Sequence, residues 1–253
     1  MLSDALNETD NEGRRWADAK WGVYAFYDYE GEPIYVGQTN EQLRVRVRRH
    51  LTNQRTDAVA MRVLDIFEVA EVALYPLWEY ELTPGSDASA KQHLNRLEYS
   101  TYLDAIDKSK YKAILNEVIP PKGEPISLPP GLRSPLISEQ LRSTRGHPDT
   151  RIARRTETLA RLAAVAHERG EVSDGLRRVL VIQAIRVSHL AAQRLAEVEG
   201  REPPTANAIN THQLVGSVLQ ESLDIDLESD ASAPESLHEY KVVRVAMPAD
   251  EAT

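Results

Sequence analysis

The sequence contains no cysteine and no long apolar run, and these two absences exclude several classes of protein. Without cysteine the chain has no disulfide scaffold and no Cys-ligated zinc site. A membrane helix needs about 20 consecutive apolar residues, and no stretch of the sequence approaches that length. The opening residues, MLSDALNETDNEGRRW, are polar and acidic and lack the apolar core of a signal peptide. We therefore expect a soluble, cytoplasmic protein.

The net charge of −9 is unevenly distributed along the chain. Residues 1–125 hold 15 Lys/Arg against 21 Asp/Glu, a net of −6; residues 126–201 hold 13 against 8, a net of +5; residues 202–253 hold 2 against 10, a net of −8. Phosphate binding depends on local basic surface rather than on total charge, so this acidity does not exclude a nucleic-acid partner. A dense basic block also lies inside the acidic first part: Arg44, Arg46, Arg48, Arg49 and His50.

Hydrophobic periodicity predicts an α+β fold in the first half. Two runs rich in aromatic and β-branched residues, 23–27 and 34–36, predict a β-hairpin. A helix should begin at Thr39, because Thr39 followed by Gln42 matches a capping box. The remaining elements that we predict here are a helix near 57–69, a strand near 72–80, a helix over 88–107 and an apolar run at 111–119.

The second half is predicted to be mainly helical. Residues 120–149 are interpreted as a proline-rich linker, because 120–135 holds six prolines and two glycines. Helical periodicity predicts a domain over 150–223, with helices at 150–170, 175–199 and 206–223. An acidic tail follows at 224–253, with a short strand at 238–246. With a leader at 1–20, these boundaries leave 21–119 for the first folded domain.

A set of chemically suitable residues occurs in order along that domain. The hairpin brings the hydroxyls of Tyr24 and Tyr35 to neighbouring strands, and Arg46 and His50 share a helix face at i and i+4. A guanidinium fork suits a phosphodiester that is gaining charge. A single carboxylate, Glu98, suits Mg²⁺, which needs few protein ligands. Tyrosine and histidine can exchange protons with an attacking water. These are the parts that a phosphodiester hydrolase needs.

The ordered pattern resembles the GIY-YIG nuclease family. It consists of GVY at 22–24, ten intervening residues, YVG at 35–37, L-x-x-R-x-x-x-H at 43–50, a helical glutamate and a later asparagine. The resemblance covers about residues 20–120. It implies a small domain with a central three-stranded antiparallel sheet flanked by helices. It also implies hydrolysis of DNA that depends on Mg²⁺ or Mn²⁺.

The resemblance further implies a role for five residues. Tyr24 corresponds to the tyrosine proposed to activate the water nucleophile, and Tyr35 to the tyrosine that orients or stabilises it. Arg46 corresponds to the arginine that stabilises the transition state. His50 corresponds to a histidine proposed to aid proton transfer, and Glu98 to the single carboxylate that binds the metal.

Four more residues are predicted to bind substrate. Asn116 corresponds to a late asparagine with a structural or phosphate-contacting role. Arg44, Arg48 and Arg49 belong to the basic block beside Arg46. Arg44 and Arg48 also offer alternative registers for the catalytic arginine.

Two hypotheses of function follow. The first is a metal-dependent DNA endonuclease that acts in restriction, phage defence or repair. The second is a non-cutting nucleic-acid-binding or adaptor protein that retains the fold. The presence of Tyr24, Tyr35, Arg46 and Glu98 favours the enzyme, because an adaptor has no physical need for all four.

The arginine-rich helical half also has two interpretations. It is either a DNA-binding module or a packing and homodimerisation domain. In the first case the arginines track phosphates; in the second they pair with Glu157, Glu168 and Glu171. The arginines concerned are Arg151, Arg154, Arg155 and Arg161. A further hypothesis is that the acidic tail mimics DNA and covers an arginine surface.

Overall fold

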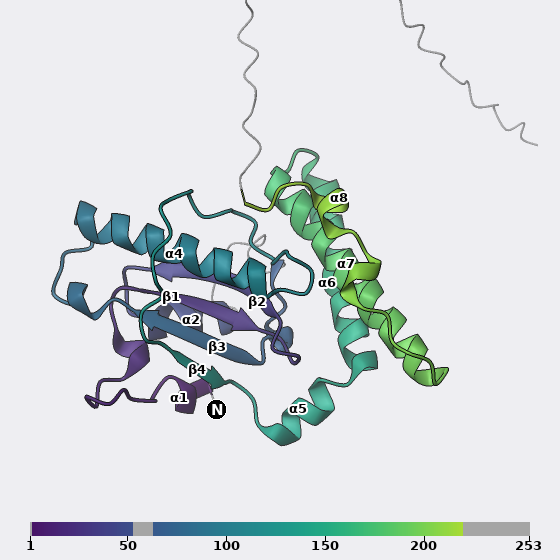
Figure 1. Cartoon of the computed structure of the whole chain (residues 1–253), viewed down its shortest axis with the longest axis horizontal. Helices are drawn as coiled ribbons and strands as arrows, with labels where there is room; N and C mark the ends of the chain where they lie inside the picture. The colour runs from purple at the N-terminus through teal and green to yellow at the C-terminus, as the bar shows by residue number, and fades with distance from the viewer. Residues whose placement is uncertain (1, 53–62, 220–253) are drawn as a thin grey trace, which may run out of the picture. The chain divides into compact units, whose positions relative to one another are not determined.

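A four-stranded antiparallel sheet lies at the centre of the computed structural model (Figure 1). The structure describes residues 2–52 and 63–219. The strands are β1 (Gly22–Tyr27), β2 (Pro33–Thr39), β3 (Glu71–Pro76) and β4 (Leu132–Pro135), in the order β2-β1-β3-β4. The hairpin between β1 and β2 turns at Gly31, whose φ of 74° favours glycine. Because β2 stands first in the strand order, it is an edge strand, and the strand that it pairs with is β1.

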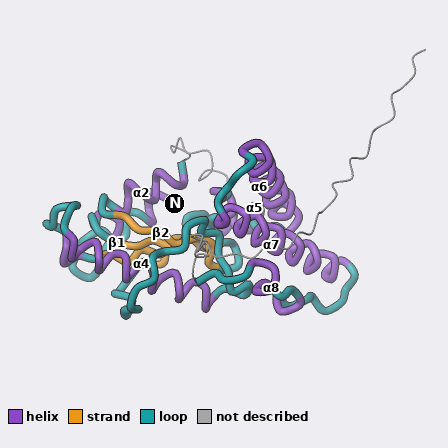
Figure 2. The backbone as a smooth tube through the Cα atoms, turned by 90° about the horizontal axis from the view of Figure 1, so that it is seen from above, coloured by secondary structure: helices purple, strands orange, loops and turns teal. Residues whose placement is uncertain are grey.

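Helices cover both faces of the sheet. Helices α2 (Leu43–Leu51) and α4 (Ala88–Lys108) lie on opposite faces (Figure 2). The other described helices are α1 (Leu2–Ala5), α5 (Glu139–Arg145), α6 (Pro148–Arg169), α7 (Asp174–Val198) and α8 (Thr211–Val215). Short 3₁₀ turns occur at Trp16–Asp18, Ile66–Glu68, Trp78–Tyr80 and Ala206–Ala208. In the described ranges, no helix combines the length and the apolar character that crossing a membrane requires.

The alternation of side chains along β1 divides the interior into two cores. Tyr24 and Phe26 point to the face that carries α2, whereas Val23 and Ala25 point to the face that carries α4. The first core continues into the C-terminal helices through Leu162, Leu176 and Val179. It also includes Leu6, Ala17 and Ala19, so the segment predicted as a leader contributes buried side chains.

The α+β fold is confirmed: an antiparallel sheet flanked by helices is followed by a helical C-terminal region. The sheet has four strands rather than the expected three. The fourth strand β4 and helix α5 lie inside 120–149, the stretch that its proline content predicts to be a linker. Strand β4 has only four residues, of which one is fully buried. Such a short strand has no hydrophobic alternation from which it could be predicted.

Several element boundaries differ from the prediction. Helix α2 begins at Leu43, and Gln42 occupies the cap position without a side-chain hydrogen bond. Thr39 instead ends β2, and its hydroxyl accepts a hydrogen bond from the Glu41 amide. The strand predicted over 72–80 stops at Pro76. The proposed capping box was therefore wrong, because Thr39 is held in the β-ladder opposite Gly22.

Other predictions fall largely on undescribed residues. Much of the helix predicted at 57–69 lies outside the described ranges, and its last part holds a 3₁₀ turn. In the described part of 206–223, the predicted third helix is reduced to a 3₁₀ turn and the five-residue α8. The acidic tail and its strand at 238–246 lie outside the described residues.

A buried ionic network joins the hairpin turn to α6 and α7. Asp28, only 1% exposed, directly follows β1. Its Oδ2 accepts hydrogen bonds from Nη2 of Arg151, Arg155 and Arg186, each at 2.9 Å. Burying charges is favourable only when they are paired and hydrogen-bonded. The network therefore requires the turn and both helices to be in place together.

A second carboxylate, Glu68, extends the network. It accepts hydrogen bonds from Nε of Arg151 at 3.2 Å and of Arg155 at 2.8 Å, and it forms an ion pair with Arg154. These three arginines thus bind carboxylates from the first half of the chain. For Arg151, Arg154 and Arg155 the structure therefore favours the packing interpretation over DNA binding. Their partners are Asp28 and Glu68 rather than the expected glutamates of the helical half. Arg161 does pair with Glu157, at the surface.

Asp28→Ala tests the energetic weight of the network. The substitution leaves three buried guanidinium groups without their shared acceptor. Breaking a buried ion pair in this way costs about 3–5 kcal/mol. We expect a loss of that size in the free energy of unfolding, measured by denaturant titration. Asp149→Ala is the control, because Asp149 pairs with Arg194 at the surface, where an ion pair contributes little to stability. Equal unfolding midpoints for the two variants would contradict the prediction.

Candidate active site

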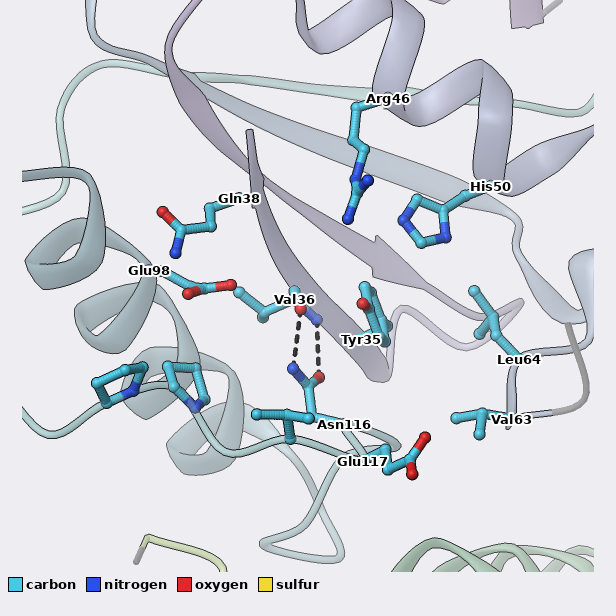
Figure 3. Close-up of a pocket in the computed structure, with 13 residues that line it drawn as sticks. Tyr35, Val36, Gln38, Arg46, His50, Val63, Leu64, Glu98, Asn116 and Glu117 are labelled. Atoms are coloured by element: carbon cyan, nitrogen blue, oxygen red, sulfur yellow. Dashed lines mark hydrogen bonds between the residues drawn. The ribbon is translucent and has the colours of Figure 1, made fainter. Parts of the chain in front are cut away.

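A cavity of about 380 Å³ lies beside the edge strand β2 (Figure 3). Helix α2 contributes Arg46 and His50, helix α4 contributes Glu98, and β2 contributes Tyr35. The other residues that line it are Val36, Gln38, Val63, Leu64, Asn116, Glu117, Val118, Pro120 and Pro121. Because α2 and α4 cover opposite faces of the sheet, the cavity extends around the free edge of β2 from one face to the other.

Tyr24 lies behind the cavity wall and contacts the cavity through His50. Its hydroxyl is 2.7 Å from His50 Nε2, and its ring stacks on Tyr35 with centroids 6.3 Å apart. Burial raises the pKa of Tyr24 far above its usual value; Tyr35 raises it further, whereas Arg46 acts in the opposite direction. The phenol therefore keeps its proton near neutral pH. The hydroxyl and His50 Nε2 are thus joined by a hydrogen bond whose donor is set by the His50 tautomer.

The two glycines of the tyrosine motifs allow close contacts across the sheet. Gly37 lies opposite Tyr24 in the β1–β2 ladder. A Cβ at Gly37 would lie 2.4 Å from the Tyr24 hydroxyl oxygen. At Gly22 a Cβ would lie 2.7 Å from the Tyr75 carbonyl oxygen and 2.9 Å from a methyl carbon of Leu43. Gly37 thus gives Tyr24 room to reach His50, and Gly22 lets α2 pack on the strand.

Arg46 presents a buried donor at the cavity. Leu43 and Val47 are the buried residues of α2, and Arg46 and His50 each follow one of them by three residues, so the four side chains are neighbours on the helix surface. Figure 3 shows the Arg46 guanidinium pointing into the cavity. Its Nε is inaccessible to solvent and has no hydrogen-bond partner among the described residues. A buried donor without a partner costs free energy, which an anionic ligand would recover.

Glu98 approaches the same cavity from the opposite face. Burial raises the pKa of its carboxyl to about 7, although hydrogen bonds from Gln38 and the charge of Arg46 act in the opposite direction. Near neutral pH the carboxyl is therefore partly protonated, and a cation bound there would have to displace that proton.

The donor set at Glu98 fits a hydrated divalent ion. Across the described ranges, no group of three or more His, Cys, Asp or Glu side chains could hold a metal. Mg²⁺ keeps several of its waters and needs one or two carboxylates, and Mn²⁺ accepts the same oxygen ligands. A single carboxylate beside a cavity of this volume suits such an ion and does not suit zinc.

Residues 20–81 match the family model for the GIY-YIG catalytic domain. The match confirms the suspected resemblance and supports a nuclease-type function in general. No curated protein and no solved structure matches the chain. The matched segment contains both tyrosine motifs and α2, and it ends before Glu98 and Asn116. In the structure Glu98 and Asn116 line the same cavity as Tyr35, Arg46 and His50 of the matched segment.

The other arginines of the basic block lie away from the cavity lining. Arg44 donates to Asp18 Oδ1 at 2.7 Å and to the Leu6 carbonyl oxygen at 2.7 Å. Arg49 forms two hydrogen bonds with the Glu41 carboxylate, at 2.6 and 2.8 Å. Arg48 is exposed. Of the four arginines on α2, only Arg46 is among the residues that line the cavity, and the structure does not bring the other three to it.

Asn116 lies in the lining, but its amide is bound to the backbone. Its Oδ1 accepts from the Val36 amide at 3.0 Å, and its Nδ2 donates to the Val36 carbonyl at 2.8 Å. Figure 3 shows both bonds. Val36 is the central residue of the YVG motif. The geometry therefore gives Asn116 a structural task at the free edge of β2, the first of the two roles that the resemblance implies.

Two polar residues of the GIY-YIG site were not predicted. Gln38 follows the YVG motif and donates from Nε2 to Asn95 Oδ1 at 2.9 Å, and its hydrogen bonds to Glu98 lower that carboxyl's pKa. Glu117 follows Asn116. Both are sequence neighbours of predicted residues, and that proximity is the one signal that could have indicated them.

Gly37→Ala tests whether the glycine makes room for Tyr24. The added methyl group must displace the phenol, and overpacking of this kind costs about 1–3 kcal/mol. We expect that loss in denaturant titration, together with a changed His50 titration in NMR spectra. Gly123→Ala is the control, since its Cβ would meet Arg96 at an ordinary 3.5 Å. An unchanged His50 titration would show that Tyr24 does not depend on Gly37.

Glu98→Gln tests the raised pKa in metal-free buffer. The folded pKa of about 7 lies above the ordinary glutamate value of 4.5. The wild type should therefore lose stability as the pH rises from 4.5 to 7, because the buried carboxyl must ionise. The loss should be on the order of 2 kcal/mol, from about 1.4 kcal/mol per pKa unit with allowance for partial exposure. Denaturant titrations should find Glu98→Gln more stable than wild type at pH 8 and equal to it near pH 4.5. A difference that is constant with pH would exclude Glu98 as the titrating group.

Proposed function

We propose that the protein is a divalent-metal-dependent endonuclease that hydrolyses DNA phosphodiester bonds. The observation that carries the proposal is the pairing of Arg46 and Glu98 at one cavity. They come from helices on opposite faces of the sheet, and the buried Nε of Arg46 has no partner among the described residues. Opposite charges that do not satisfy each other fully suit a ligand carrying both signs, such as a phosphodiester with its counter-cation.

In this proposal the scissile phosphate enters between Arg46 and Glu98. Arg46 donates to the non-bridging oxygens, whose charge grows in the transition state. The attacking water gives its proton to His50, which lines the cavity and whose Nε2 is hydrogen-bonded to the buried Tyr24 hydroxyl. The water oxygen forms a bond to phosphorus, and the ester P–O bond breaks. The leaving oxygen takes a proton from solvent.

Glu98 would hold the divalent cation, with Gln38 bound to its carboxyl and fixing its orientation. The cation supplies charge neutralisation at the phosphate. Tyr35 stacks on Tyr24 and exposes part of its ring to the cavity. We therefore assign Tyr35 to holding the Tyr24–His50 pair and to orienting the water.

A cleavage assay tests the function. Purified protein is incubated with plasmid and with single-stranded DNA, in Mg²⁺ or Mn²⁺. Loss of one charged group that stabilises the transition state reduces turnover by about 10²–10³-fold. We expect such a loss for Arg46→Ala and for Glu98→Ala. Arg161→Ala is the matched control, because Arg161 forms a surface ion pair with Glu157, and it should cut like the wild type.

Two outcomes would contradict the proposal. If wild type and both site variants are equally inert on every substrate, the endonuclease hypothesis fails. If the wild type binds DNA without cutting it, the adaptor hypothesis replaces it. A cleaving enzyme would fit restriction, phage defence or repair, and an adjacent methyltransferase gene would favour restriction.

A further inference from the structure

We propose that the first turns of α7 position the catalytic strand β2, with Ser173, Gly175 and Arg178 as positioning residues. The contact runs through residues 116 and 117. It gives the helical half a task at the active site, and it rests on the proposed function only for its effect on catalysis. The three residues lie outside the GIY-YIG match, which ends at residue 81.

The first step is the edge of β2. Val36 uses its amide and carbonyl to bind the Asn116 side chain. Next to this, the Leu115 amide donates to the Ile34 carbonyl at 2.8 Å. Residues 115 and 116 therefore occupy the hydrogen-bonding positions along the free edge of the strand. A strand held on one side only would be easier to displace.

The second step is the anchorage of Glu117, the residue next to Asn116. Its carbonyl oxygen accepts from Arg178 Nη2 at 2.9 Å, and its carboxylate accepts from the Ser173 hydroxyl at 2.8 Å. Ser173 is also the N-cap of α7, where its Oγ accepts from the Leu176 amide. Both the backbone and the side chain of Glu117 are thus tied to the beginning of α7.

The third step is the close approach at Gly175. A Cβ at this position would lie 2.0 Å from the Glu117 carbonyl oxygen. Gly175 is the second residue of α7, and any other side chain there would collide with this backbone. Its use here is explained by the backbone of residue 117, which packs directly on the helix. Leu176 and Val179 continue the contact in the core that also holds Leu115 and Ile34.

The catalytic consequence follows from the position of Val36. It lies between Tyr35, which lines the cavity, and Gly37, over which Tyr24 reaches His50. A shift of β2 at Val36 would move both features against Arg46 and Glu98. Displacements near 1 Å can reduce turnover by about 100-fold. Substrate binding elsewhere on the surface would be unaffected.

The test uses the full-length protein and the variants Gly175→Ala and Arg178→Ala. We expect kcat to fall about tenfold or more with KM for DNA nearly unchanged, because the strand is misplaced and no substrate contact is lost. Hydrogen exchange at the Val36 amide should accelerate about tenfold, while the β1 amides keep their protection. Ser173→Thr keeps the cap and the hydroxyl, and should retain wild-type kcat.

Arg177→Ala is the matched control. Arg177 is an exposed neighbour on the same turn and contacts only the Gly170 carbonyl, at 3.5 Å, among the described bonds. If Gly175→Ala and Arg178→Ala match this control in Val36 exchange, the positioning role is overturned. The exchange measurement needs no cleavage, so it decides the inference even if the wild type proves inert. If Gly175→Ala fails to fold, Arg178→Ala gives the result, and Arg178→Lys should restore part of the protection.

Discussion

Three guanidinium groups converge on one carboxylate oxygen, Oδ2 of Asp28, at the turn between β1 and β2. Arg186 is almost completely buried, and its guanidinium is paired there with Asp28 at 2.9 Å. Asp28 stands one residue after β1 and five before β2, so its position determines where the hairpin lies relative to α6 and α7. The same α7 contacts residue 117 at its first turns. The contact between Asp28 and Arg186 thus holds α7, the helix whose first turns bind residue 117 beside the cavity.

The candidate site is assembled around the outer edge of β2, which pairs with residues 115 and 116 rather than with another strand, and not inside a single face of the sheet. Arg46 and His50 come from one side, and Glu98 comes from the other. This arrangement leaves a buried donor on Arg46 and raises the pKa of Glu98 to about 7. Both features are unfavourable in the free protein. The Asp28 network and the two cores supply the stability that offsets them, a distribution common at functional sites.

Local patterns predicted the hairpin, α4 and five of the residues that line the cavity (Tyr35, Arg46, His50, Glu98 and Asn116), because each depends on a short range of sequence. The tyrosine motifs have fixed spacing, and Glu98 lies beside buried Leu94 and Leu97 on a periodic helix. Strand β4 could not be predicted, since four residues without alternation carry no signal. The partners of Arg151 and Arg155 lie more than 80 residues away in the chain, and no local pattern encodes such a contact. Arg44 likewise binds Asp18 and Leu6, contacts that no local pattern encodes.

The arginine-rich half shows why a regional charge count is a weak argument for DNA binding. Residues 126–201 have a net charge of +5, yet Arg151, Arg155 and Arg186 are buried against carboxylates from residues 28 and 68. These arginines are thus neutralised by carboxylates of residues 1–125, which lie outside the counted range. The net of −6 in residues 1–125 is reduced by the same contacts. In the proposed function, phosphate recognition depends on which donors keep an open hydrogen-bonding position at the cavity, and the buried Nε of Arg46 is such a donor among the described residues.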